Sequence, residues 1–259
     1  MYKRQVQGDA LRRLRGVQLG MVFQDARSAL NPTLPIGEQV AEVARLHLGM
    51  DAGQAARHAA GLLQRVGLPG AGERARSYPH ELSGGMCQRV VLAMAVACNP
   101  AVLIADEPTT ALDVTTQAQI LDLIEELQAQ AGMGVLLITH DLALVAERAQ
   151  RVAVLYAGRI VEAGPTAEVF GSPRHPYTRG LLDCVPDLEA LRPLVPIPGA
   201  LPSPYELPTG CRFAQRCGRA EGRCTDEDPV LGAADSGSVK PATGQRSVAC
   251  HFPLDGGEA

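Results

Sequence analysis

Two acidic residues, Asp106 and Glu107, directly follow a short apolar run and could bind a metal ion and activate a water molecule. The run reads Ala-Val-Leu-Ile-Ala over residues 101–105, which is the pattern of a strand buried on both faces of a parallel sheet. Open α/β sheets bind their ligands at the carboxyl ends of such strands. One carboxylate there can hold Mg²⁺, and the next can polarise a water molecule that attacks a phosphate. The pair therefore predicts phosphate chemistry at a strand end.

Ser83, Gly84 and Gly85 form a second feature that suits a phosphate. A serine favours the N-cap position of a helix, and the two glycines leave the backbone N–H groups of the first turn unobstructed. The positive end of the helix dipole points out of that turn and attracts anions. We therefore expect a helix that begins in the glycines and offers its amino terminus to a phosphate.

Gln24 and His140 are two further polar residues at predicted strand ends. Gln24 follows the apolar run of residues 19–23, and His140 follows the apolar run of residues 135–138 after a single threonine. The run of residues 135–138 predicts a second strand of the type buried on both faces. Taken alone, either residue is more often a structural surface side chain. The interval between Glu107 and His140, however, is that of a β-α-β unit with a helix over residues 116–129. This order makes a functional role the better interpretation for both.

Together these features resemble the ABC-transporter ATPases. Residues 82–113 are similar to the signature motif, the Walker B strand and the D-loop of that family, in the family's order and spacing. The resemblance implies three catalytic residues: the Q-loop glutamine Gln24, the water-polarising Glu107 and the H-loop histidine His140. It also implies a nucleotide-binding set, in which Asp106 holds Mg²⁺ as well. The members of that set are Ser83, Gly84, Gly85, Gln88, Asp106 and Asp113.

The predicted fold is α/β, a P-loop NTPase-like ABC ATPase core with a parallel sheet and a helical subdomain. Apolar residues at three- and four-residue steps indicate the helical subdomain over about residues 36–100. Two strands, over residues 151–155 and 159–162, are expected to form a hairpin around Ala157-Gly158 that finishes the sheet. The chain is then expected to divide into two domains, residues 1–164 and residues 165–259.

The sequence contains no glycine-rich Walker A loop, which would hold the β- and γ-phosphates of ATP. Lys3 and Lys240 are the only lysines, and neither lies in a GxxxxGK[ST] pattern. Since this loop precedes the Q-loop in the family, we interpret the chain as lacking the amino-terminal β-subdomain, with a degenerate subunit as the alternative. The chain by itself is expected to bind ATP weakly or not at all.

The carboxy-terminal region, from about residue 165, differs in composition from the rest of the chain. Prolines recur between residues 173 and 208, which favours extended segments and excludes a long helix or a central strand there. His175-Pro176-Tyr177-Thr178 and Ile197-Pro198-Gly199 resemble the extension found in the ATPases of dipeptide, oligopeptide and nickel importers. This similarity narrows the general ABC resemblance to that branch.

Four cysteines in this extension, spaced C-x5-C-x6-C-x25-C, are candidate metal ligands. They are Cys211, Cys217, Cys224 and Cys250. Such a group in a cytoplasmic chain most often binds a metal, although structural zinc usually has a pair spaced by two to four residues. Importer ATPases that the extension resembles carry a [4Fe–4S] cluster, for which four thiolates are the normal ligands. Zinc, unligated thiols and redox disulfides remain alternatives.

Composition and charge exclude several classes of function. With 259 residues, of which 46% are hydrophobic, the chain can bury a sizeable core. A net charge of −4 and 3% aromatic residues argue against nucleic-acid binding. No apolar run approaches the roughly 18 residues of a membrane span. Seven cysteines, an odd number, argue against a secreted disulfide framework, so a cytoplasmic protein is predicted.

The function that the resemblance implies is ATP binding and hydrolysis in an ABC importer of di- or oligopeptides, or of nickel. The expected partners are a second ABC ATPase subunit, two transmembrane permease subunits and, indirectly, an extracytoplasmic solute-binding protein. The expected location is the cytoplasmic face of the membrane. In the family's dimers the signature motif completes the opposing subunit's site, so Ser83–Gly85 would face a partner's nucleotide. The alternatives are a non-hydrolysing subunit that donates this motif, a fragment without independent activity, and a metal-cluster module.

Overall fold

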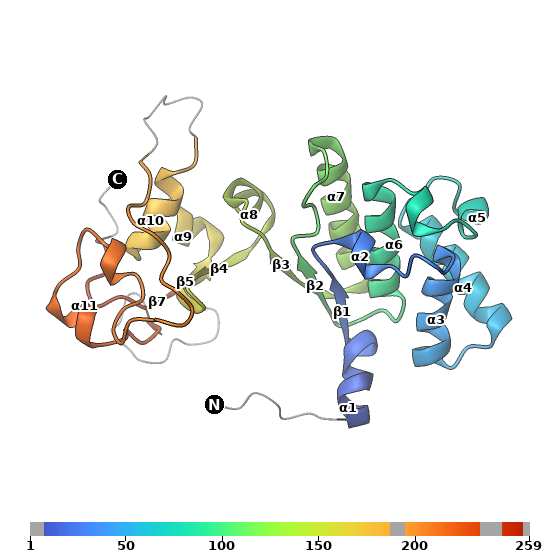
Figure 1. Cartoon of the computed structure of the whole chain (residues 1–259), viewed down its shortest axis with the longest axis horizontal. Helices are drawn as coiled ribbons and strands as arrows, with labels where there is room; N and C mark the ends of the chain where they lie inside the picture. The colour runs from blue at the N-terminus through green and yellow to red at the C-terminus, as the bar shows by residue number, and fades with distance from the viewer. Residues whose placement is uncertain (1–7, 187–194, 234–244, 256–259) are drawn as a thin grey trace. The chain divides into compact units, whose positions relative to one another are not determined.

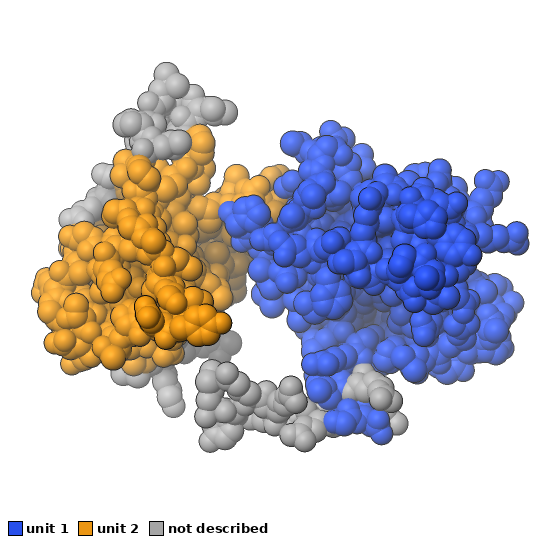
Figure 2. All heavy atoms as spheres, viewed as in Figure 1, with its two compact units in different colours: residues 1–140 blue, residues 141–259 orange. Residues whose placement is uncertain are grey.

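The computed structural model describes residues 8–186, 195–233 and 245–255, and the chain divides into two compact units. The first unit contains residues 1–140 and the second contains residues 141–259 (Figure 2). The predicted domain boundary between residues 164 and 165 therefore lies inside the second unit. As a boundary between the ATPase core and the extension, it stays a prediction.

The first unit contains a three-stranded parallel sheet in the order β1-β2-β3 (Figure 1). Its strands are β1 (Leu19–Val22), β2 (Val102–Asp106) and β3 (Gly134–Ile138). Their carboxyl ends are in register, since Val22 pairs with Ala105 and Asp106 pairs with Ile138. The predicted parallel α/β architecture is confirmed.

Strand β3 differs from the sequence prediction, which treated it as a strand buried on both faces. Val135 and Leu137 pack against the hydrophobic core, but Leu136 and Ile138 on the opposite face are 53% and 44% exposed. The prediction was wrong because β3 is an edge strand of the described sheet. One of its faces packs on helices, while the other carries apolar side chains in contact with solvent.

Helices between β1 and β2 form the predicted helical subdomain. They are α2 (Ala26–Ala29), α3 (Ile36–Leu48), α4 (Ala52–Arg65), α5 (Ala71–Arg74), the 3₁₀ helix η2 (Pro79–Glu81) and α6 (Gly84–Val96). The turn from α3 to α4 is encoded locally. Gly49 ends α3 in the left-handed conformation, with φ of 65°, and Asp51 begins α4 with a capping box to Gln54.

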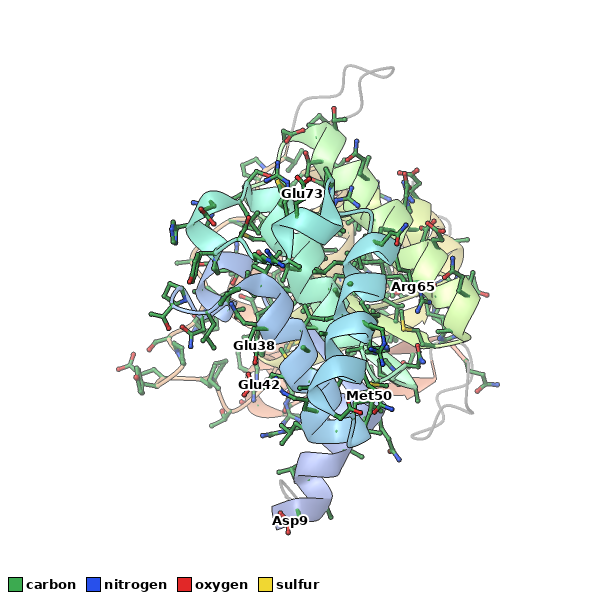
Figure 3. All side chains as sticks on the ribbon, turned by 90° about the vertical axis from the view of Figure 1, so that its right-hand side faces the viewer. Asp9, Glu38, Glu42, Met50, Arg65 and Glu73 are labelled. Atoms are coloured by element: carbon green, nitrogen blue, oxygen red, sulfur yellow. The ribbon has the colours of Figure 1, made fainter. Side chains whose placement is uncertain are left out.

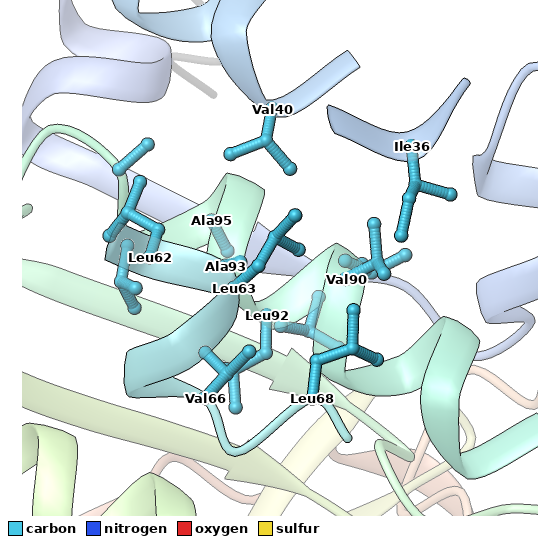
Figure 4. Packing of buried hydrophobic residues seen from close by; sticks show 14 of the residues in the cluster. Ile36, Val40, Leu62, Leu63, Val66, Leu68, Val90, Leu92, Ala93 and Ala95 are labelled. Atoms are coloured by element: carbon cyan, nitrogen blue, oxygen red, sulfur yellow. The ribbon is translucent and has the colours of Figure 1, made fainter. Parts of the chain in front are cut away.

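The core of the first unit is aliphatic and lies where α3, α4 and α6 pack on one another. Ile36, Val40, Leu63 and Val90 are completely buried, and Leu92 is nearly so (Figure 4). Burying a side chain of this size contributes about 1.5–3 kcal/mol. These contacts hold the helix that starts at Ser83 against the sheet.

The outer surface of the helical subdomain is charged. Glu38, Glu42, Arg65 and Glu73 are exposed there (Figure 3), and Arg45 pairs with Glu38 at 2.5 Å. Within the described ranges, every helix is too short or too polar to cross a lipid bilayer.

Helix α7 (Val114–Ala131) connects β2 to β3 and packs on the sheet. Asp113 is its N-cap and Gly132 ends it in the left-handed conformation, with φ of 63°. Ile120, Ile124 and Leu127 form its buried stripe. The helix predicted over residues 116–129 is therefore confirmed. Helix α7 forms the parallel crossover from β2 to β3, and the helical subdomain forms the crossover from β1 to β2.

The second unit contains an antiparallel sheet in the order β4-β5-β7-β6. Its strands are β4 (Arg151–Tyr156), β5 (Arg159–Pro165), β6 (Gly232–Ala233) and β7 (Ser247–Val248). The predicted hairpin exists, and its turn residues Ala157 and Gly158 both have positive φ, as a tight turn of the mirror-image type requires. It does not finish the parallel sheet, however. The free edge of β5 pairs with β7 instead, so the hairpin packs with the extension.

The remaining helices of the described chain are short. They are α1 (Gly8–Arg13) and η1 (Leu14–Gln18) before β1, and α8 (Leu142–Arg148), α9 (Thr166–Gly171), α10 (Pro176–Asp183), η3 (Ala214–Arg216) and α11 (Gly222–Asp226) in the second unit. Among the described residues after residue 165, no helix exceeds the eight residues of α10. This agrees with the helix-breaking effect expected of the prolines.

Glu162, on β5, anchors the loop that leads into α10. Its carboxylate is completely buried and accepts hydrogen bonds from the backbone N–H groups of Arg174 (3.0 Å) and His175 (2.9 Å). The Arg246 guanidinium pairs with the same carboxylate at 2.7 Å and also donates to the Ser172 carbonyl. Since one buried anion satisfies several donors, it fixes the positions of three separate segments.

Candidate functional site

Glu107 lies at the carboxyl end of β2 in an unusual backbone conformation. Its φ is +43°, in the left-handed region that non-glycine residues seldom adopt. Its N–H donates to the carbonyl of Ile138 at 2.9 Å, which ties it to the end of β3. Strained residues of this kind persist where the surrounding structure holds them, often at functional sites.

Three donors from separate segments converge on the Glu107 carboxylate. The Gln24 amide Nε2 donates to Oε2 at 2.6 Å, and the Thr110 hydroxyl donates to the same oxygen at 2.8 Å. The His140 Nδ1 lies 3.0 Å from Oε1. Gln24, Glu107 and His140 follow β1, β2 and β3 respectively, so the predicted catalytic residues meet at one edge of the sheet.

These hydrogen bonds hold the carboxylate in its charged form. The bonds from His140 and Thr110, with a further contribution from Gln24, lower the pKa of Glu107 below its ordinary value, although burial opposes them. Because an ionised carboxylate only accepts, the His140 nitrogen at 3.0 Å must carry a proton. His140 Nε2 is then available to another group, and its side chain is 79% exposed.

Asp106 is the last residue of β2 and lies half-buried beside Glu107. Within the described ranges, no three or more His, Cys, Asp or Glu side chains enclose a point where a metal ion could sit. Mg²⁺ at phosphate sites needs only one or two carboxylates, since phosphate oxygens and waters supply the other ligands. Asp106 therefore fits a Mg²⁺ ion that arrives with a phosphate.

The residues from Ser83 to Gly85 form a second group at the start of α6. Ser83 is the N-cap, and its hydroxyl accepts from the Met86 N–H at 3.3 Å. Gly85 is packed against α7, since a Cβ there would lie 2.6 Å from Cγ2 of Thr116. A larger residue would push the two helices apart, so glycine is required at this position.

Asp113 belongs to this second group because it begins α7 beside the start of α6. Its carboxylate accepts from the Thr116 N–H at 3.0 Å and from the Thr116 hydroxyl at 2.6 Å. These bonds lower the pKa of Asp113. Its carboxylate is therefore occupied in capping α7. Two helix amino termini lie side by side here, and both dipoles attract anions.

Gln88 lies apart from both groups. Its side chain is only 4% exposed, and its Nε2 has no hydrogen-bond partner among the described residues. This burial leaves its amide inaccessible in the isolated chain, and the predicted nucleotide contact stays a prediction. Gln88 lies about one turn into α6 on a face that packs inward, and the sequence pattern did not reveal this.

Thr110 was not identified from the sequence. It reaches Glu107 because residues 107–110 form a turn, in which the Thr110 N–H also donates to the Glu107 carbonyl at 3.1 Å. A hydroxyl three residues after a carboxylate, with a proline between them, is a turn pattern. That signal was available in Glu107-Pro108-Thr109-Thr110.

The four predicted metal-ligating cysteines meet in the second unit. All of them line one cavity of about 20 Å³, together with His175, His251 and Phe213. The four residues are Cys211, Cys217, Cys224 and Cys250. A cavity of this size has room for about one water molecule, and among the described residues the four sulfurs are not arranged as a metal-coordinating group.

Three of the thiols around this cavity are held in their neutral form. Burial raises the pKa of Cys211 and of Cys217, and it raises the pKa of Cys250 to about 11. The proximity of the other cysteines adds to each shift. A metal that binds here must therefore displace protons. Four cysteine thiolates are nevertheless the ordinary donor set for an iron–sulfur cluster or for zinc, so the residue types fit.

His175 borders the same cavity and is nearly completely buried. Its Nδ1 accepts from the Tyr177 N–H at 3.0 Å and caps α10, which puts the ring proton on Nε2. Burial lowers the pKa of His175 from 6.5 to about 4. The folded protein therefore holds this histidine neutral at pH values where the unfolded chain protonates it.

The unfolding free energy is expected to fall as the pH falls from about 6.5 toward about 4, because only the unfolded state gains a proton there. The loss attributable to His175 is about 3 kcal/mol. His175→Asn, which keeps a capping oxygen, should flatten this dependence in urea unfolding measured across the range. His80→Asn, at an exposed position, should leave it unchanged. An unaltered pH slope in His175→Asn would contradict the assignment.

Comparison with protein families finds two matches. A family described as "ABC transporter" matches residues 2–110, and one described as "Oligopeptide/dipeptide transporter, C-terminal region" matches residues 161–224. The first covers the strand end at Glu107, and the second covers three of the four cysteines.

Individual relatives are similar over most of the chain. A "Putative peptide import ATP-binding protein" of Brucella melitensis is 54% identical over 234 residues, which are 88% of this chain and 69% of that protein. The "Dipeptide transport ATP-binding protein DppD" of Escherichia coli is 46% identical over 245 residues, which are 94% of this chain and 72% of that protein.

A solved structure supports the fold. The ATP-binding cassette MJ0796, described as dimeric, in a post-hydrolysis state and bound to ADP and Pi, is 30% identical, with a TM-score of 0.56. The match covers 62% of this chain and 68% of that one. The α/β fold of an ATP-binding cassette is therefore established for the described core.

Proposed function

Because the chain belongs to the ATP-binding subunits of ABC-type peptide importers, we propose that it hydrolyses ATP to drive the import of di- or oligopeptides. The observation that carries the proposal is the convergence of Gln24, Thr110 and His140 on the ionised Glu107 carboxylate. Both relatives, from Brucella melitensis and Escherichia coli, are described as peptide or dipeptide transport proteins, which favours peptides over nickel as the solute.

The side chains at the strand ends have complementary roles in this proposal. The Glu107 carboxylate would accept a hydrogen bond from the attacking water and align it, while the Gln24 amide orients the carboxylate. His140, which donates through Nδ1, would direct Nε2 toward the terminal phosphate. Asp106 would hold Mg²⁺, which supplies charge neutralisation on the phosphates when it is bound.

Ser83, Gly84 and Gly85 would act on a nucleotide held by an opposing subunit. Their helix start is separate from the Glu107 network, and the similar cassette MJ0796 is described as dimeric. The proposed assembly contains a second ATPase subunit and two permease subunits at the cytoplasmic face of the membrane. A non-hydrolysing subunit that only donates this motif is the second candidate, favoured by the separation of the two groups.

The test is ATP hydrolysis by the chain assembled with its permease subunits and partner ATPase in lipid vesicles. Turnover should rise severalfold when a peptide-loaded solute-binding protein is added, and nickel should give no such stimulation. Stimulation by nickel and not by peptides would overturn the choice of solute. Hydrolysis that does not depend on this chain would overturn the proposed activity.

The isolated 259-residue chain is expected to bind ATP with a dissociation constant in the millimolar range or weaker. The corresponding binding free energy is about −4 kcal/mol or closer to zero. The reason is that the sequence holds no GxxxxGK[ST] motif to cradle the phosphates. Isothermal titration calorimetry with Mg²⁺ and ATP measures this. Micromolar binding by the chain alone would show that the phosphates are held by other groups.

We further propose that Cys211, Cys217, Cys224 and Cys250 hold a [4Fe–4S] cluster, with zinc as the alternative. Support comes from the four thiols that line one cavity and from the chemistry of four cysteines as a ligand set. Protein purified without oxygen should contain about four iron and four sulfide per chain, and Cys217→Ser should lose both. Cys184→Ser, at an exposed cysteine outside the cavity, should retain them. Zinc without iron would refute the cluster.

A further inference from the structure

Arg27 connects the Gln24 segment to the start of α6. It lies in the first turn of the short helix α2, three residues after Gln24. Asp25 is the N-cap of α2, and its carboxylate accepts from the N–H groups of Arg27 (3.0 Å) and Ser28 (3.3 Å). The backbone of Arg27 is therefore fixed relative to Gln24, whose amide binds Glu107.

The side chain of Arg27 leaves α2 and reaches the residue before Ser83. Its Nη2 donates to the Leu82 carbonyl at 3.0 Å across a partly buried space. Leu82 itself is 3% exposed, and its N–H donates to the Pro79 carbonyl. A guanidinium donor makes a stronger hydrogen bond than a neutral one, so this contact helps to fix the peptide that begins the N-cap.

The same guanidinium lies beside Cys87, which is completely buried in the first turns of α6. Burial raises the pKa of Cys87, and Arg27 opposes that rise through its charge and a hydrogen bond to the sulfur. The Cys87 Sγ also lies 3.6 Å from the Pro79 carbonyl oxygen. Arg27 thus acts at the start of α6, through its hydrogen bond to the Leu82 carbonyl and through its charge near Cys87.

These contacts form one continuous path between the two groups of site residues. Glu107 binds Gln24, Asp25 caps α2, Arg27 projects from α2, and Leu82 precedes Ser83. Ala26 of α2 is buried in the core and Ala29 packs against the same core, so α2 is held firmly in place. A shift of Gln24 would therefore reach the Ser83 turn through Arg27.

We propose that Arg27 is a positioning residue that couples the Gln24 side of the site to the Ser83–Gly85 turn. A change at Gln24 after hydrolysis is thereby passed to the group that faces the opposing subunit's nucleotide. The link to ATP hydrolysis rests on the proposed function, whereas the mechanical coupling between Gln24 and the Ser83–Gly85 turn does not.

Amide hydrogen exchange on the full chain tests the coupling without nucleotide. In Arg27→Met the Met86 N–H, which donates to Ser83, should exchange about 10-fold faster than in the wild type. Arg27→Lys, whose ammonium can still reach the Leu82 carbonyl, should stay within about 3-fold of the wild type. Arg65→Met, which removes an exposed contact to Gln130 on the far side of the subdomain, is the matched control and should have no effect.

A double-variant cycle distinguishes coupling from simple loss of packing. Asp25→Ala, which removes the cap of α2, should speed exchange at Met86 when Arg27 is present and should add nothing in the Arg27→Met background. Effects of the two variants that multiply would overturn the proposal, as would unchanged Met86 exchange in a folded Arg27→Met protein. If Arg27→Met does not fold, Arg27→Gln, too short to reach Leu82, takes its place. All of these exchange measurements are made without ATP turnover. A failure of the proposed coupling can therefore be distinguished from a failure of the proposed function.

Discussion

Replacement of Glu107 by glutamine is expected to slow ATP hydrolysis by the assembled transporter by about 100-fold or more, the usual contribution of a positioned base. A glutamine cannot carry the negative charge that the three hydrogen bonds stabilise. It also has one acceptor oxygen, which cannot serve Gln24, Thr110 and His140 together. The rate of phosphate release in vesicles, measured over a range of ATP concentrations, checks this.

The expected kinetic pattern is a fall in kcat with little change in KM, because Glu107 acts on the water and not on the bound nucleotide. Glu126→Gln, at an exposed carboxylate on α7 that contacts only Gln130 in the described residues, is the matched control and should keep the wild-type rate. Wild-type turnover in Glu107→Gln would favour the subunit that donates its signature motif without hydrolysing ATP.

Glu162→Ala is expected to destabilise the second unit by about 3–5 kcal/mol, the usual cost of leaving one partner of a buried ion pair alone. The substitution leaves the Arg246 guanidinium, which is 9% exposed, without its carboxylate. It also removes the acceptor for the N–H groups of Arg174 and His175. Urea unfolding followed by circular dichroism measures the change.

The control for this variant is Arg223→Ala, which breaks a pair with Glu227 whose side chains are both 59% exposed. Exposed pairs of this kind contribute very little to stability, so the control should unfold at nearly the wild-type urea concentration. A Glu162→Ala protein that unfolds together with the control would show that the buried pair is compensated elsewhere.

The sequence predicted the residues that meet at the sheet edge because their information is local. Gln24, Glu107 and His140 each follow an apolar strand pattern, and parallel strands bring such positions to one edge. The N-cap at Ser83 and the glycine at residue 85 could also be predicted from the sequence, since a helix start depends on a few consecutive residues. The roles of these residues in nucleotide chemistry stay predictions.

Features that depend on pairing between distant segments could not be predicted. The hairpin at residues 151–165 has the same local sequence pattern whichever sheet it joins. Only the pairing of β5 with β7 shows that it belongs to the antiparallel sheet of the second unit. Burial of Gln88 depends on which face of α6 packs inward, and the apolar residues surround that helix too evenly to show it. Arg27 could not be linked to Leu82, because 55 residues separate them.

The left-handed backbone at Glu107 has a consequence for engineering. Glycine or asparagine accepts a positive φ more readily than glutamate, so a library screened only for heat resistance would tend to enrich such replacements at this position. Each of them would lack the carboxylate that Gln24 and His140 orient. A screen for heat resistance would therefore favour glycine or asparagine at position 107, whereas a screen for ATP turnover would favour glutamate. A stabilised variant should keep Glu107 unchanged.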